Sequence, residues 1–104
     1  MKVFADEFTS EISGTYGGPC ESPFVLKHNG KYYLFIGPYG GYNVSYSDTA
    51  VYESDDSMSF DPANIVGRIP SHASEIIDID GELYITHCGW GKGGVYLARL
   101  HFEE

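Results

Sequence analysis

The alternation of apolar and polar residues predicts two β-hairpins. The segment FVLKHNGKYYLFIG, residues 24–37, has a strand-like run on each side of Asn29-Gly30, and EIIDIDGELYITHC, residues 75–88, repeats this pattern around Asp80-Gly81. Both dipeptides accept positive φ at the two turn positions, which favours the type I′ turn that joins paired strands. No stretch of ten or more residues has a clear 3.6-residue apolar period, so we expect little or no helix.

The two hairpins are 51 residues apart, and the similarity continues beyond their turns. Each hairpin is followed by a Gly-rich loop and then by another strand-like run. Identities at the same offset include Gly30 with Gly81, Tyr33 with Tyr84, Gly40 with Gly91, and Val44 with Val95. We interpret the chain as two copies of one unit of about 50 residues, which is the size of a β-propeller blade.

The repeat predicts an all-β fold of two four-stranded antiparallel propeller blades in a single domain, residues 1–104. The first blade is expected at about 17–62 and the second at about 63–104. The second copy lacks a fourth strand, which residues 2–8 or a neighbouring chain could supply. An ordinary β-sandwich, which needs no repeat, is the alternative. The expected strands are 22–28, 31–37, 42–47 and 50–54 in the first copy, and 73–79, 82–88 and 94–102 in the second.

The charge of the chain excludes two classes of partner. A net charge of −9 argues against nucleic acid and anionic membranes, since both require a basic face. No apolar run approaches the roughly 18–20 residues that a membrane-spanning helix needs. Nine tyrosines on an acidic chain are compatible with neutral carbohydrate, because aromatic rings stack on sugars and carboxylates accept hydrogen bonds from hydroxyl groups. Carbohydrate is therefore compatible with this composition as a ligand, although the composition alone does not identify it.

The cysteines and the N-terminus favour a reducing compartment. Asp6 and Glu7 interrupt the only apolar stretch near Met1, so nothing there resembles a signal peptide and we expect a cytoplasmic chain. Cys20 and Cys88 are then expected as two free thiols, with a single disulfide as the alternative. The histidines and cysteines lack the spacing of a zinc site, and no metal site is predicted.

The candidate site begins with one isolated acid. Glu21 directly precedes an apolar strand, and the repeat places His72 at the equivalent position of the second copy, so the two side chains are expected to converge. Glu75, Tyr39 and Trp90 are further candidates for substrate binding, the last two as sugar-stacking rings in Gly-flanked loops. Each residue also has a purely structural interpretation. Glu21 is then a carboxylate at the end of a strand, His72 a structural histidine and Glu75 an exposed strand residue. The rings of Tyr39 and Trp90 then pack within their loops.

Two longer segments carry a family resemblance. CESPFVLKHNGKYYLFIG and SHASEIIDIDGELYITHCGWGKGGVYLARL resemble the later blades of the five-bladed propeller glycoside hydrolases of families 43 and 32, which act on furanosides such as arabinans and fructans. In those enzymes a Glu-x-Pro motif opens the third blade and supplies the general acid, which matches Glu21-Ser22-Pro23. A histidine that opens a later blade, near an ion or water in the channel, matches His72. The resemblance spans about residues 17–102 and implies no cofactor beyond a structural ion such as Ca²⁺.

The same resemblance implies that part of the machinery is absent. The enzymes take a second catalytic Asp from the first blade and a transition-state-stabilising Asp from the second, and neither is found in this chain. Glycoside hydrolysis requires two carboxylates on either side of the bond. We therefore expect a glycoside hydrolase-like propeller fragment or subunit that carries the general acid. The alternatives are a non-catalytic carbohydrate-binding or self-assembling propeller module and an unrelated β-sandwich interaction domain. Open blades expose faces and edges, so we also expect a homo-oligomer or missing blades.

Overall fold

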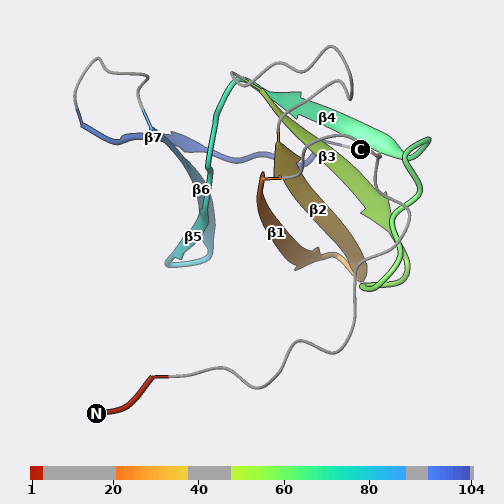
Figure 1. Ribbon diagram of the computed structural model, residues 1–104, viewed down its shortest axis with the longest axis horizontal. Helices are drawn as coiled ribbons and strands as arrows, with labels where there is room; N and C mark the ends of the chain where they lie inside the picture. The colour runs from red at the N-terminus through yellow and green to blue at the C-terminus, as the bar shows by residue number, and fades with distance from the viewer. Residues whose placement is uncertain (4–20, 38–47, 89–93, 104) are drawn as a thin grey trace.

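The computed structural model describes residues 1–3, 21–37, 48–88 and 94–103, and these residues form strands and no helix (Figure 1). They build two antiparallel sheets, with strand orders β1-β2-β3-β4 and β5-β6-β7. The all-β prediction is confirmed. The strands are β1 Glu21–His28, β2 Lys31–Gly37, β3 Thr49–Ser54, β4 Ile65–Ile69, β5 Ile76–Ile79, β6 Glu82–His87 and β7 Tyr96–Arg99.

Both predicted hairpins are present. Asn29 and Gly30 have φ values of 50° and 78° between β1 and β2, and Asp80 and Gly81 have 52° and 85° between β5 and β6. Positive φ at both central residues is the type I′ conformation, whose twist matches that of the flanking strands. The turn chemistry therefore sets the register of both hairpins.

The third and fourth strands of the first sheet differ from the prediction. The run expected as the fourth strand, residues 50–54, is the third strand, and β4 was not predicted. The expected strand at 42–47 lies outside the described residues. The constant offset of 51 caused the error: Leu34 pairs with Tyr52, whereas its counterpart Ile85 pairs with Ala98, only 46 positions after Tyr52. The first sheet consequently extends to Ile69, beyond the boundary expected at 62.

The second sheet has three strands within the described part of the chain. They are shorter than the predicted runs, because β5 begins at Ile76 rather than at 73 and β7 covers only Tyr96–Arg99. Of the segment 2–8, only residues 2 and 3 are described, and they form no strand. The origin of a fourth strand therefore stays a prediction.

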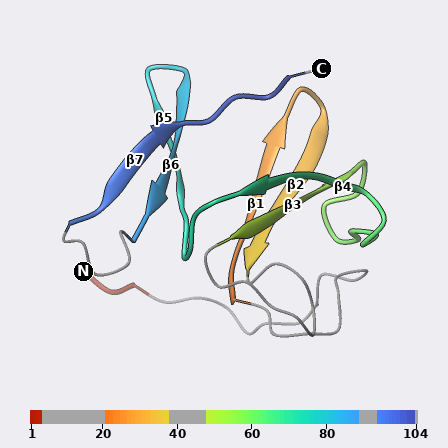
Figure 2. The ribbon, with the colours of Figure 1, turned by 90° about the horizontal axis from the view of Figure 1, so that it is seen from above.

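The two sheets face each other, as Figure 2 shows with β5, β6 and β7 on the left and β1 to β4 on the right. Buried Phe35, Val51 and Ile85 form the centre of the core between them. The partly buried apolar residues around this centre come from both sheets and from the segment after β7: Phe24, Leu26, Tyr33, Ile69, Ile76, Leu100 and Phe102.

The face that lies in the core between the sheets is not the equivalent one in the two units. Leu26 of the first sheet packs in the core between the sheets, but its counterpart Ile77 is 40% exposed. Conversely, Ile85 is buried in that core, whereas its counterpart Leu34 packs on the opposite face of the first sheet. One face of the first unit therefore packs against the other face of the second, which is head-to-tail packing rather than two-fold packing.

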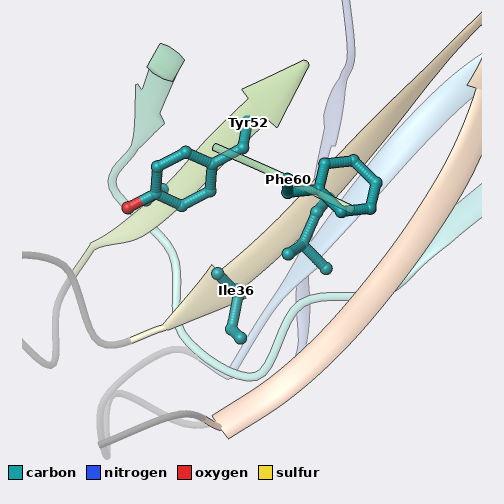
Figure 3. Packing of buried hydrophobic residues seen from close by; sticks show 5 residues of the cluster. Ile36, Tyr52 and Phe60 are labelled. Carbon is teal, nitrogen blue, oxygen red and sulfur yellow. The ribbon is translucent and has the colours of Figure 1, made fainter. Parts of the chain in front are cut away.

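The far face of the first sheet has its own core (Figure 3). Phe60, from the connection between β3 and β4, is fully buried against Ile36 and Tyr52, together with Leu34 and Ala50. The corresponding far face of the second sheet exposes Ile77, Ile79 and Leu97, by 40%, 46% and 52%. Among the described residues, the first sheet is thus covered on both faces, whereas the second is covered on one.

Candidate functional site

The structure brings Glu21 and His72 together, as their equivalent positions in the repeat predict. The distance between Glu21 Oε2 and His72 Nε2 is 3.8 Å. Glu21 is the first residue of β1, and His72 lies in the segment between β4 and β5. The side chains are 45% and 22% exposed, so both are accessible to a ligand in solution. The contact is an ion pair when the imidazole is protonated.

The backbone next to both residues is strained in the same way. Ser22 follows Glu21 with φ of 51°, and Ala73 follows His72 with φ of 53°. Positive φ is uncommon for residues other than Gly, Asn and Asp, and it occurs often at binding and catalytic sites. Ser22 and Ala73 are themselves 51 positions apart. The repeat therefore extends to the local backbone geometry that aims Glu21 and His72, and β1 carries a register shift between Glu21 and Phe24.

His87, in β6, is hydrogen-bonded to the backbone of His72. The backbone N–H of His72 donates a hydrogen bond to His87 Nδ1 over 3.3 Å. Because Nδ1 accepts this bond, the neutral ring carries its proton on Nε2. His87 lies opposite Tyr96 in the sheet, and their ring centroids are 6.3 Å apart. His87 was not predicted as a site residue, although extending the register of the β5–β6 hairpin places it opposite Ser74, two residues after His72.

Buried hydroxyl groups fix the segment that carries His72. Ser71 and Ser74 are 3% and 6% exposed, and Ser74 Oγ donates to Ser71 Oγ over 2.5 Å. Thr49 Oγ1, at the start of β3, donates to the carbonyl oxygen of Ser71 over 2.9 Å. These bonds attach the His72 segment to the first sheet, where Glu21 lies. The Glu21–His72 pair is consequently positioned by both sheets rather than by one free loop.

The other predicted binding residues are not brought to this pair. Glu75 is exposed, and its backbone pairs with Thr86, whose N–H donates to the Glu75 carbonyl over 2.9 Å. The side chains of Glu75 and Thr86 lie on the same face of the second sheet as Ile77, and this face is turned away from the first sheet. Tyr39 and Trp90 lie outside the described residues. A binding role for these three residues stays a prediction.

A second carboxylate, Asp48, stands just before β3, but it is neutralised. Its Oδ2 accepts a hydrogen bond from Arg68 Nε over 2.6 Å, and the Arg68 guanidinium also pairs with it through a terminal nitrogen. This carboxylate is only 13% exposed and is suited to holding the chain rather than to proton transfer. Over the described residues, no group of three or more His, Cys, Asp or Glu side chains is arranged to hold a metal ion.

Two further observations bear on the sequence predictions. Cys88 has a free, exposed thiol, as expected, and Cys20 lies outside the described residues. In the part of the chain that the structure covers, there is no helix with the length and apolar character needed to cross a bilayer.

No protein-family model, curated protein or solved structure matches the chain. The arrangement of its own residues is therefore what a functional proposal has to rest on.

Proposed function

We propose that the chain is a glycoside hydrolase-like propeller unit in which Glu21 is the general acid for cleavage of furanoside-type bonds. The observation that carries the proposal is the 3.8 Å approach of Glu21, the first residue of β1, to His72, which lies four residues before the equivalent strand β5. A general acid must be accessible to the leaving oxygen and held in a fixed direction before substrate binds. The exposed carboxylate of Glu21 and the strained, hydrogen-bonded backbone around it meet both requirements.

In the proposed reaction, Glu21 donates its proton to the glycosidic oxygen as the bond to the anomeric carbon breaks. His72, directly beside it, contacts the sugar and keeps the carboxyl group oriented. A second carboxylate must act on the opposite side of the anomeric carbon. At about 5–5.5 Å from the acid it bonds to that carbon, and water then hydrolyses the glycosyl intermediate with retention; at about 6.5–9.5 Å it activates a water that attacks the carbon with inversion. The proposal assigns that group to further blades, because the sequence offers no matching Asp.

The head-to-tail packing of the two sheets supports the propeller part of the proposal. When one face of each unit packs on the opposite face of the next, units can add in a ring around one axis. The N-terminal ends of the innermost strands then surround that axis, where Glu21 begins β1 and His72 lies in the segment just before β5. A two-fold sandwich would instead bury equivalent faces against each other, and Leu26 and Ile77 show that this is not the case here.

The test is an assay of aryl furanosides and aryl pyranosides with the wild type and Glu21→Gln. Hydrolysis by the wild type that falls at least 100-fold in Glu21→Gln supports the proposal. Glu103→Gln is the matched control, since it removes the same charge from an exposed position in the C-terminal segment. Equal activity of wild type and Glu21→Gln, including none, contradicts a catalytic role for Glu21 in this chain.

Non-catalytic carbohydrate binding is the second candidate, and the missing second carboxylate favours it. In that case the wild type binds furanoside oligosaccharides without turnover, and NMR shifts of the His72 ring follow saturable binding. Glu21→Gln would then weaken binding rather than abolish a reaction. Activity and binding measured on the same pair of variants therefore separate the two functions.

A further inference from the structure

The outer edge of β7 is open as far as the structure describes the chain. β7 pairs with β6 on one side, and Leu100 N–H donates to the Leu83 carbonyl over 2.8 Å at the end of this pairing. Hydrogen-bonded and non-hydrogen-bonded pairs alternate in an antiparallel ladder. The backbone N–H and C=O groups of Leu97 and Arg99 therefore point away from β6, and β7 has no second neighbour among the described strands.

The first sheet shows what occupies this place in the equivalent unit. β3 is the counterpart of β7, and its outer edge pairs with β4, where Val51 lies opposite Gly67. Val51 packs in the core between the sheets, whereas its counterpart Leu97 lies on the far face of the second sheet and is 52% exposed. The second sheet thus has the strand order of the first, but the position of its fourth strand is unfilled within the described part of the chain.

A groove adjoins the open edge. It has a volume of about 450 Å³ and lies between the β2–β4 part of the first sheet and residues 100–103, which follow β7 directly. Its apolar wall is continuous with the core between the sheets, because Phe35 and Val51 belong to both. Gly67 of β4 leaves the floor open, since it has no side chain over Val51. The other apolar lining residues are Tyr33, Val66, Ile69, Leu100 and Phe102.

We propose that this edge and groove bind an extended strand of another polypeptide, with aliphatic side chains at alternate positions. The strand pairs antiparallel with β7 through the backbone groups of Leu97 and Arg99, as β4 pairs with β3. Its inward side chains enter the groove above Val51 and Gly67 and extend the core between the sheets. Strand addition of this kind takes affinity from main-chain hydrogen bonds and specificity from pockets for alternate side chains.

The probe for this proposal is a peptide with the sequence of residues 63–70, ANIVGRIP, which contains β4. It is titrated to millimolar concentration into the ¹⁵N-labelled full chain and followed by NMR. We expect saturable shifts and slowed hydrogen exchange at the amides of Leu97 and Arg99, together with shifts at groove residues such as Phe102. Shifts confined to β3, or to the exposed face that carries Ile77, would overturn the proposal.

Two variants separate the edge from the groove. Leu97→Pro removes an N–H that points away from β6, so the β6–β7 pairing remains while the edge loses a donor. Gly67→Val fills the floor of the groove, and its Cβ would lie 3.6 Å from the Val51 side chain, an ordinary contact. Each variant should weaken peptide binding at least tenfold.

Ile77→Thr is the control, because it changes an exposed residue that belongs neither to the β7 edge nor to the groove. It should bind the peptide like the wild type. The far-ultraviolet circular dichroism of each variant verifies its fold, and the shift map of the wild type stands if one variant does not fold. Unchanged binding in a folded Leu97→Pro, or no saturable binding by the wild type, overturns the proposal independently of any hydrolase activity.

Discussion

Glu21 Oε2 lies 3.8 Å from His72 Nε2, although the residues are 51 positions apart and stand before or at the start of strands in different sheets. Each is followed by a non-glycine residue with positive φ, and the two φ values differ by only 2°. The contact therefore arises from the repeated local structure of two units together with the packing between them. This relationship allows the contribution of the pair to stability to be separated from its contribution to function.

We expect the Glu21–His72 pair to contribute little to folding. Exposed ion pairs are worth about 0–1 kcal/mol, and Glu21 is 45% exposed. Glu21→Gln and His72→Asn should each change the free energy of unfolding by less than about 1 kcal/mol, and so should their coupling in a double-mutant cycle. Urea denaturation of the wild type, the two single variants and the double variant measures this. A coupling of about 3 kcal/mol would instead identify the pair as a structural link between the sheets.

The backbone conformation at Ala73 predicts which side chains this position tolerates. Its φ of 53° is unfavourable for a β-branched residue. Ala73→Val should therefore destabilise the fold by about 1–3 kcal/mol, whereas Ala73→Gly should leave stability within about 1 kcal/mol of the wild type. Thermal and urea unfolding of both variants provide the measurement. If Ala73→Val is as stable as Ala73→Gly, the left-handed conformation next to His72 is not retained in solution.

Phe60 should be the most sensitive point of the second core. Its side chain is fully buried on the face of the first sheet that is turned away from the second sheet. Phe60→Ala should cost about 3–5 kcal/mol, a large share of the roughly 5–15 kcal/mol that stabilises a typical domain. Met58→Ala is the control, because that side chain is 42% exposed in the same connection, and it should change stability by about 0.5 kcal/mol or less. Equal effects of the two substitutions would show that Phe60 does not cover the sheet in solution.

The features that the sequence predicts correctly are local or repeated. The Asn29-Gly30 and Asp80-Gly81 turns are correct because each dipeptide accepts the positive φ that its turn requires. The approach of Glu21 to His72 is correct because hairpins with two-residue turns keep the offset of 51. Both successes depend on short connections that leave no freedom of register.

The failures occur where a connection can change length or where both sides of a strand are exposed. β4 gives only a weak strand pattern, because Gly67 interrupts the alternate aliphatic positions Ile65 and Ile69, and Val66 and Arg68 between them are both exposed. Residues 50–54 were expected as the fourth strand rather than the third because the paired residues Leu34 and Tyr52 of β2 and β3 are 18 positions apart, whereas Ile85 and Ala98 of β6 and β7 are 13 apart. His87 was missed because its proximity to His72 follows only when the register of the second hairpin is extended beyond the Ile76–Ile85 pair.

The interactions of the Lys31 ammonium predict how its contribution to stability changes with pH. The hydrogen bond from Lys31 Nζ to Asp55 Oδ1, over 3.2 Å, and the negative charges of Asp55 and Glu53 raise the pKa of Lys31 above its ordinary value of 10.5. The folded state therefore favours the charged lysine more than the unfolded chain does. This contribution is fully present below pH 10.5 and is lost as the pH rises through the raised pKa of the folded state.

Lys31→Met should accordingly be less stable than the wild type at pH 8, by a small amount because the ammonium is exposed to solvent and salt. The difference should stay constant up to about pH 9.5 and then shrink as the wild-type lysine loses its proton. Urea denaturation of both proteins from pH 8 to pH 11 measures it, in low salt and in 1 M NaCl. Asp55→Asn removes the main cause of the shift, so Lys31→Met in that background should show a much weaker dependence on pH. A difference that grows above pH 10.5 would mean that the carboxylates do not stabilise the charged form of Lys31.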